Sequence, residues 1–566
     1  MMKNNVLNLN NRIDVLNIIK CIILSIVVIL ISTFFISKKA NLDIDEFYTY
    51  GLSNNAFQLN IENFKDYSGE ELLLDYTAAK DGHLFDVDNV FFNQKMDTHP
   101  PLYFLLVNFI SSINKNKFSM WYGLSINIFF LIILFWTTRH LLYKLIKNKI
   151  SATILTLIVF TLYGFINNYS FTRMYVMLSA MSLLFVSLII NYVERINKVD
   201  NKQTSNYKES VDQTKVSINI KKRFDYKFLI SFYLICVLGI LTQYHFMLVA
   251  GFFSVILAIS LINKKQFAML FATFVSGIFS IFTSIIIFPP MLSHIFGGAN
   301  STHSLSSFSS ADSFVEKVSK LFIGLYKAFF GPGIIVYLVL IIIGIIILIA
   351  IKKIERKSIK NFIFENYLYF LILLFVIVYF ILICCTVKLS FHRYLYNIYP
   401  FIFILIISPV YIIFNKINKY LLFVPIVLML ILSISTTYKN SPTSLNTEDA
   451  LFSEYLRNNK DTKVILLYRT VDKSLNRNSV NTSLWKLPTP LYVFKDMENM
   501  TFVDISNEDA LANFSNKTIE GYNDLFLVIY TSEDDQKFIN YIMKKNNVST
   551  ANRIYFTTYY HVYRLS

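Results

Sequence analysis

IIKCIILSIVVILISTFFISKKANLDIDE, residues 18–46, joins a long apolar run to the acidic segment Asp43-Ile44-Asp45-Glu46. The run at 14–37 is long enough to cross a bilayer and lacks a small-residue cleavage site. It therefore predicts a retained membrane helix rather than a cleaved signal peptide. We expect the N-terminus to be cytoplasmic and the acidic residues to lie just beyond the outer leaflet.

The rest of the chain repeats this pattern. Its 566 residues are 54% hydrophobic, with a mean hydropathy of +0.48. Eleven apolar runs predict an α-helical, multispanning membrane protein, and they lie near 14–37, 118–138, 150–168, 174–192, 228–244, 246–262, 266–288, 332–351, 366–387, 394–414 and 420–437. The net charge of +16 sits largely in short loops between these runs, so membrane orientation explains it and no nucleic-acid partner is expected.

Lys and Arg collect in alternate loops, which we place in the cytoplasm. An odd number of spans then puts the chain beyond residue 438 outside the membrane. We divide the chain into a transmembrane domain, 1–437, and an extracytoplasmic α/β domain, 438–566. In the second domain, 463–468, 525–530 and 553–556 resemble strands, and 447–456 and 533–545 resemble amphipathic helices.

Two outer segments are long. Segment 38–117 is polar and acidic, then carries a short apolar stretch after Pro100-Pro101 that predicts a juxtamembrane helix at 102–110. Segment 289–331 begins with two prolines and is rich in Gly and Ser, which predicts a mobile loop. The inner segment 193–227 lacks periodicity and predicts a flexible linker.

The acidic residues after the first run are candidates for chemistry. Carboxylates beside a low-dielectric surface can act as a general base, for which Asp45 and Glu46 are the candidates. Asp43 and Asp45 could instead bind a divalent cation. A solvated helix cap is the alternative without chemistry.

Several cations and histidines fall at the same predicted face. Arg173 stands at an outer helix end, where a fork of donors suits an anionic phosphate, although, taken alone, an arginine reaching for lipid headgroups explains the residue better. The other members of this set are His99, His245, Lys388, His392 and Arg393. A carboxylate, cations and an interfacial apolar helix together suit transfer from a lipid-linked phosphate: a base, charges to stabilise the leaving phosphate and a groove for the lipid tail.

The order of these residues resembles the GT-C superfamily of polyprenyl-phosphate-sugar glycosyltransferases, most closely the protein O-mannosyltransferase and aminoarabinose-transferase type. The resemblance covers about 14–437 and rests on Asp45-Glu46, His99-Pro100-Pro101-Leu102-Tyr103, Arg173-Met174-Tyr175, Tyr244-His245 and Arg393-Tyr394. It implies an inverting transfer to an extracytoplasmic acceptor, with Asp45 as leading base candidate and Glu46 beside it.

The resemblance also implies a donor site. The residues that would face the donor phosphate or sugar are His99, Arg173, Tyr175, His245, Lys388, His392 and Arg393. The Asp43-x-Asp45 spacing is similar to the metal-binding pair of oligosaccharyltransferase relatives. A monophosphate donor leaves less charge to neutralise, so we expect no obligatory metal, with Mg²⁺ or Mn²⁺ possible.

Other readings stay open. A secondary transporter, or a flippase of a cell-envelope precursor, would also have many spans and a basic inner face, although transporters usually place charges near mid-membrane. A membrane anchor for the C-terminal domain is a third reading. The acceptor could be a protein, a wall polymer or a glycolipid. Heavy use of Ile, Lys and Asn favours a bacterial cell membrane and an undecaprenyl carrier.

Overall fold

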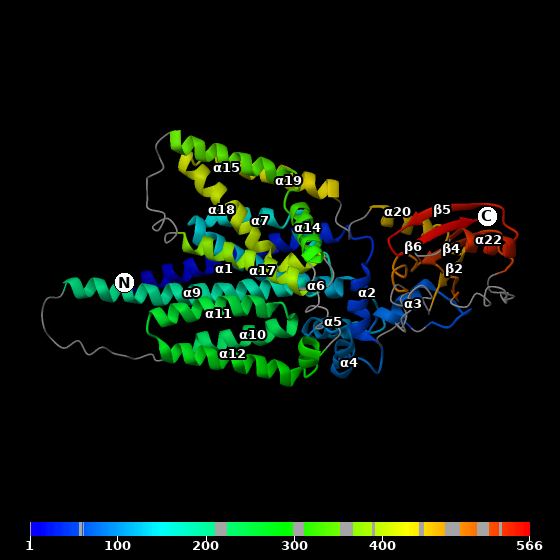
Figure 1. Ribbon diagram of the computed structural model, residues 1–566, viewed down its shortest axis with the longest axis horizontal. Coiled ribbons are helices and arrows are strands. Elements are labelled where there is room, and N and C mark those ends of the chain that lie inside the picture. Colours follow the sequence, from blue (N-terminus) through cyan, green and yellow to red (C-terminus); the bar gives the residue numbers. More distant parts are fainter. Residues whose placement is uncertain are drawn as a thin grey trace.

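The protein has an elongated bundle of helices with a small mixed sheet at one end (Figure 1). The computed structural model describes residues 2–55, 59, 61–209, 224–297, 311–350, 366–387, 391–440, 447–469, 487–505, 520–530 and 535–566. Short helices from the first long outer segment lie between the bundle and the sheet (Figure 1). This arrangement is that of an α-helical, multispanning membrane protein with a small α/β region.

The bundle contains helices of very different length. They are α1 (Met2–Ile36), α6 (Trp121–Ile146), α7 (Lys149–Val159), α8 (Tyr163–Tyr169), α9 (Tyr175–Glu209), α10 (Tyr226–Thr242), α11 (Phe246–Asn263), α12 (Phe267–Ile287), α14 (Ala311–Ala328), α15 (Gly333–Ala350), α17 (Tyr367–Thr386), α18 (Tyr399–Ile417) and α19 (Phe423–Asn440). A short π-helix, η1 (Ser293–Gly297), and a short 3₁₀-helix, η2 (His392–Ile398), complete it. Within the described residues, seven helices are long and apolar enough to cross a membrane, or up to nine if each bent pair is one span.

Each of the eleven apolar runs falls on a helix, but four of them depart from a simple span. Run 150–168 forms α7 and α8, which meet at 70°, and run 332–351 forms the second arm of a pair bent by 76°. Helix α10 and the apolar part of α19 are shorter than the other spans. At the first bend, the Thr161 carbonyl accepts hydrogen bonds from Ser433 and Thr437 of α19. These bonds satisfy the Thr161 carbonyl, which in a continuous helix would accept a hydrogen bond from an amide of the same helix.

Two segments predicted to be irregular are helical, so those predictions were wrong where the structure describes them. In segment 289–331, α14 covers residues 311–328. Its Phe314, Val318, Leu321 and Leu325 recur at helical spacing and pack on the main core. In segment 193–227, α9 continues to Glu209. Residues 298–310 and 210–223 lie outside the described residues.

The first long outer segment forms four helices: α2 (Ile44–Asn54), α3 (Gly69–Thr77), α4 (Val87–Asp97) and α5 (Leu102–Ile113). The helix predicted at 102–110 is thus present as α5, and its position beside the membrane stays a prediction. Side chains of Asp43, Ser68 and Asp86 cap α2, α3 and α4 by accepting hydrogen bonds from their first-turn amides. These caps explain how a polar, acidic segment forms short helices.

The sheet has the strand order β1-β3-β2-β4-β6-β5. Its strands are β1 (Asp66–Tyr67), β2 (Lys463–Tyr468), β3 (Met500–Asp504), β4 (Leu525–Tyr530), β5 (Ala551–Phe556) and β6 (Tyr560–Leu565), with helices α20 (Thr447–Arg457) and α22 (Asp535–Asn546). Strand β2 pairs in parallel with β3 and β4. Its side chains alternate between two buried cores, one against α22 and one against the first outer segment. A strand buried on both faces gives a continuous apolar run, which is why 463–468 was recognisable.

The sheet is not built from the C-terminal residues alone. Strand β1, from the first outer segment, pairs antiparallel with β3. Asp66 accepts a 2.6 Å ion-pair bond from Lys463, and Asn41 donates to Asp449 over 3.1 Å. The two outer regions therefore pack as neighbours, and the division at 437/438 stays a prediction.

Candidate functional site

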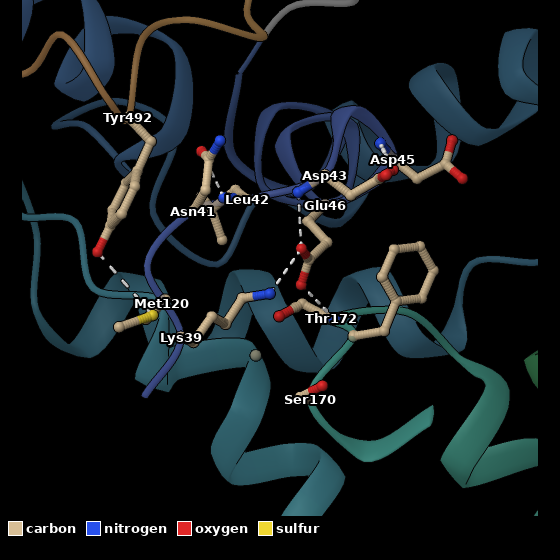
Figure 2. A network of polar contacts seen from close by, with 12 residues as sticks. Lys39, Asn41, Leu42, Asp43, Asp45, Glu46, Met120, Ser170, Thr172 and Tyr492 are labelled. Carbon is tan, nitrogen blue, oxygen red and sulfur yellow. Dashed lines mark hydrogen bonds and ion pairs between the residues drawn. The ribbon is translucent and has the colours of Figure 1, made fainter. Parts of the chain in front are cut away.

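The site is built around the first turn of α2. Asp43 is the N-cap: its carboxylate accepts a hydrogen bond from the Asp45 amide over 3.0 Å, and Glu46 accepts one from the Asp43 amide over 2.8 Å. This reciprocal arrangement is a capping box, which fixes the start of a helix. As a result, the Asp45 and Glu46 side chains leave the helix in different directions (Figure 2).

Glu46 points into the protein and is fully buried. It forms a 2.9 Å ion pair with Lys39, whose side chain is also buried, and it accepts a 2.7 Å hydrogen bond from the Thr172 amide (Figure 2). Its oxygens are thus held by Lys39, Thr172 and the Asp43 amide. A carboxylate so enclosed has no surface at which to meet a substrate.

Asp45 points the other way, toward two arginines from distant parts of the chain. Its Oδ2 lies 2.6 Å from Arg393 Nη1, in η2, and its Oδ1 lies 3.8 Å from Arg173 Nη2, just before α9. The Asp45 side chain keeps 19% of its surface exposed, against 0% for Glu46. Of the two acidic candidates, Asp45 is therefore the one that solvent or a substrate can reach.

Both arginines hold unused donor capacity. The Nε atoms of Arg173 and Arg393 are buried and have no hydrogen-bond partner within the described residues. Arg173 Nη1 donates a long, 3.3 Å hydrogen bond to Thr49. Buried donors normally find partners, so two unpartnered guanidinium N–H groups beside one carboxylate indicate a place for an anion.

A histidine and tyrosine group borders this ion cluster. His99 Nδ1 lies 2.9 Å from Asp97 Oδ2, so the Asp97 carboxylate orients the imidazole ring. Burial raises the pKa of Asp97, but His99 and Arg173 outweigh it and hold that pKa below its usual value. The His245 ring packs edge-on against Tyr394. Burial, together with His99, lowers the pKa of His245 to about 4, so His245 is neutral near pH 7.

The other predicted donor-site residues sit deeper or elsewhere. Tyr175 packs edge-on against Tyr396 and stacks on Phe171. His392 contacts Tyr396 Oη at 3.3 Å. Lys388 lies outside the described residues. The structure thus brings Asp45, Arg173 and Arg393 into direct contact, with the His99–Asp97 and His245–Tyr394 pairs beside them.

The capping carboxylate of Asp43 has unusual electrostatics. Burial, and next the neighbouring charge of Asp45, raise the pKa of Asp43 to about 6. Among the described residues, no group of three or more His, Cys, Asp or Glu is placed to hold a metal ion. In the Asp43-x-Asp45 pair, Asp43 accepts from a backbone amide and Asp45 is already matched by Arg393.

Sequence reasoning missed three residues here. Lys39 pairs with Glu46, Asp97 orients His99, and Tyr559 comes from the turn between β5 and β6 in the sheet region. Asp97 could have been noticed, because it stands two residues before His99. Nothing in the sequence indicates that Tyr559 lies near residues 43–46.

Fold and site together define a multi-pass membrane protein with an acid and arginine cluster at one end of its helical bundle. No family model matches the chain, and no curated protein matches its sequence. Among solved structures, a crystal structure of ArnT from Cupriavidus metallidurans bound to undecaprenyl phosphate is similar over 96% of this chain and 97% of the other, at 7% identity and a TM-score of 0.44. At that score and identity, the match assigns neither a family nor an activity to this chain.

Proposed function

We propose that this chain is an inverting membrane glycosyltransferase that moves a sugar from a polyprenyl-phosphate carrier to an extracytoplasmic acceptor. The observation that carries the proposal is the contact of Asp45 with Arg173 and Arg393, whose Nε atoms remain unpartnered. The order of the motifs along the sequence supports the same function. We place the site at the outer face of a bacterial cell membrane, with the N-terminus in the cytoplasm.

The arginines would bind the donor phosphate. A guanidinium about 4 Å from a phosphate oxygen contributes roughly 4 kcal/mol at an effective dielectric of 20. As the bond between the sugar C1 and the phosphate oxygen breaks, the electron pair leaves with the phosphate, and charge develops where Arg173 and Arg393 point. Preformed cations at that place stabilise the transition state more than the ground state.

Asp45 would act as the base. In the free protein Arg393 holds its carboxylate at 2.6 Å. A donor phosphate competes for the same guanidinium and frees the Asp45 oxygens to accept the proton of the acceptor hydroxyl. The acceptor oxygen then forms its bond to C1 on the face opposite the leaving phosphate, which inverts the configuration. The proton ends on Asp45.

Glu46 takes a different role from the catalytic one expected. Because Glu46 is enclosed by Lys39, Thr172 and the Asp43 amide, we assign it to positioning: it fixes the first turn of α2 and so the direction of Asp45. His99, which Asp97 orients, would donate to the phosphate or sugar. We keep His245, Tyr175 and His392 as residues that shape the donor site.

We propose that no metal is obligatory. In many phosphoryl and glycosyl sites a divalent cation neutralises the phosphate. Here two arginine side chains are placed to do so, and the pair that could bind Mg²⁺ or Mn²⁺, Asp43 and Asp45, is engaged by protein donors. The donor would be undecaprenyl-phosphate-linked, and the acceptor would be a protein, a wall polymer or a glycolipid.

The test is sugar transfer by the full chain in proteoliposomes. Undecaprenyl-phosphate carrying a radiolabelled sugar is the donor, and envelope extract from cells lacking this protein supplies acceptors. We expect label to move from the lipid to the acceptor fraction only when the protein is present. Absence of transfer across a panel of hexose and pentose donors, with solute flux into liposomes that hold no lipid-linked sugar, would favour a transporter instead.

A further inference from the structure

We propose that the cavity between the start of α2 and the turn joining β5 to β6 is the acceptor subsite, and that it takes an uncharged carbohydrate. This inference rests on the proposed function and adds the chemical class of acceptor to it. The cavity has a volume of about 240 Å³. One wall comes from residues 41–44, Glu46 and Phe171, the other from residues 555–560 of the sheet region.

The cavity has rigid polar walls. Asp449, in α20, is buried and accepts hydrogen bonds from Asn41 and from the Tyr555 hydroxyl. Thr489, also buried, lies in the same lining. In the same lining, Thr557 Oγ1 accepts hydrogen bonds from the Tyr559 and Tyr560 amides at 3.1 and 3.0 Å, which fixes the turn. A preformed pocket of this kind binds a ligand without first having to order its own loops.

Charge is divided between the two sides of α2. The lining of the cavity contains Asp43, Glu46 and Asp449 but no Lys, Arg or His among the described residues. Glu46 is paired with the buried Lys39, and the other cations of the site, Arg173 and Arg393, lie on the side to which Asp45 points. An anionic group is therefore favoured at the arginines and disfavoured in the cavity. This division separates a phosphate-bearing donor from an acceptor without negative charge.

Aromatic rings and oxygen acceptors share the lining. Phe556 is 64% exposed although it closes β5, and it lies in the cavity wall with Phe171 and Tyr559. The Asp43 carboxylate and the hydroxyls beside them can accept hydrogen bonds from hydroxyl groups. An aromatic face offers apolar area with a polar rim at low conformational cost. Flat apolar surfaces rimmed by oxygen acceptors match a pyranose ring better than an extended peptide, whose backbone needs paired donors as well.

The cavity lies against the turn of α2 that carries Asp45: Asp43, Ile44 and Glu46 line it, and Asp45 itself does not. Tyr559, at its rim, is affected by the same charges that make up the donor site: burial, and then Asp43 and Asp45, raise its pKa to about 12, whereas Arg393 opposes this. A sugar in the cavity would thus lie against the first turn of α2, which carries the proposed base. In this way the sheet region, far along the chain, completes the site.

The test is ligand binding without turnover. Saturation-transfer NMR on the full chain in nanodiscs, with methyl β-glucopyranoside as probe, should show transfer to the sugar ring protons. Phe556→Ala should weaken this binding by about fivefold, the loss of roughly one aromatic contact. The matched control is Leu451→Ala, an equally exposed apolar residue of α20 outside the lining, which should bind as the unchanged protein does.

The outcomes separate the two proposals. Binding of the glycoside that Phe556→Ala weakens, in a protein that does not bind undecaprenyl phosphate, would retain the subsite and reject the donor site. Binding of undecaprenyl phosphate without glycoside binding would do the reverse. Preference for a Ser- and Thr-containing hexapeptide, or for glucuronate over the neutral glycoside, would overturn the carbohydrate subsite. So would equal binding by Phe556→Ala, or equal loss in Leu451→Ala.

Discussion

Arg393 Nη1 lies 2.6 Å from Asp45 Oδ2, although Asp45 follows the first membrane helix and Arg393 precedes one of the last. The pair ties η2 to α2 at the end of the bundle that faces the sheet (Figure 1). It also keeps a carboxylate and a phosphate-binding group in one place. Binding of a donor phosphate would exchange the partner of Arg393 and leave Asp45 free.

Arg393→Lys should weaken the binding of undecaprenyl phosphate by roughly 30-fold, because a lysine cannot reproduce the guanidinium fork and a lost charged hydrogen bond costs about 2 kcal/mol. Binding can be measured by titrating the lipid into the purified protein in detergent. Arg195→Lys is the control, since it alters an exposed ion pair with Asp225 toward the other end of α9. Equal affinities for all three proteins would remove Arg393 from the donor site.

The sequence predicted this end of the molecule well because its few charged residues stand out against apolar runs. Asp45, Arg173 and Arg393 each occur at the end of such a run, so threading the runs through a bilayer places them together. The sequence could not predict contacts that form only when the segments outside the membrane fold together. In the sequence, Lys39 looks like any basic residue that follows a membrane span. The turn that contains Tyr559 lies near the site only because the sheet positions it there.

The helical segments that were missed have a different cause. The first outer segment is largely polar before Pro100, so α2, α3 and α4 depend on side-chain caps and on packing against the sheet rather than on a strong apolar stripe. In α14 the stripe is present, but the Ser-rich residues before it dominated the composition. Strand β1 has two residues, which is too short for any periodicity to be visible.

Lys39→Met should destabilise the protein strongly. It leaves the Glu46 carboxylate buried without its cation, a change that costs about 3–5 kcal/mol in buried pairs. The apparent Tm in detergent should fall by several degrees, and Lys39→Met with Glu46→Gln should recover part of that loss. Lys460→Met, which breaks an exposed pair with Glu498, should change Tm little. A Tm unchanged by Lys39→Met would mean that Glu46 does not depend on this ion pair.

Asp43 should make stability depend on pH. Its pKa is raised from 3.8 to about 6 in the folded protein, so between these values the folded state binds more protons than the unfolded state. Stability from this group is therefore present at low pH and is lost as the pH rises toward and through 6. The difference in Tm between the unchanged protein and Asp43→Asn should fall from pH 4 to pH 6.5 and then stay level.

Asn is a suitable replacement because it also caps helices. His245 has the opposite sign: its pKa is lowered to about 4, so its contribution to stability grows as the pH rises. His245 is present in both the unchanged protein and Asp43→Asn, so its contribution cancels in the difference between their Tm values. A difference that is flat with pH, or that rises, would contradict the raised pKa of Asp43.

Transfer should persist in chelator. If Arg173 and Arg393 neutralise the donor phosphate, excess EDTA should leave the rate within about twofold of its untreated value, whereas removal of an essential metal abolishes activity. The measurement is the transfer rate in proteoliposomes after chelation and dialysis. Loss of activity that Mn²⁺ or Mg²⁺ restores would show that the Asp43 and Asp45 pair, or another group, holds a metal.

The most direct measurement is sugar transfer by Asp45→Asn. The substitution keeps the shape of the side chain but removes the proton acceptor, and loss of a positioned base lowers rates by about 10²–10⁴-fold. We expect that loss in the proteoliposome assay, with Tm and undecaprenyl phosphate binding retained, while Asp88→Asn, at an exposed acid in the first turn of α4, transfers normally. Normal turnover by a folded Asp45→Asn protein would contradict the assignment of Asp45 as the base.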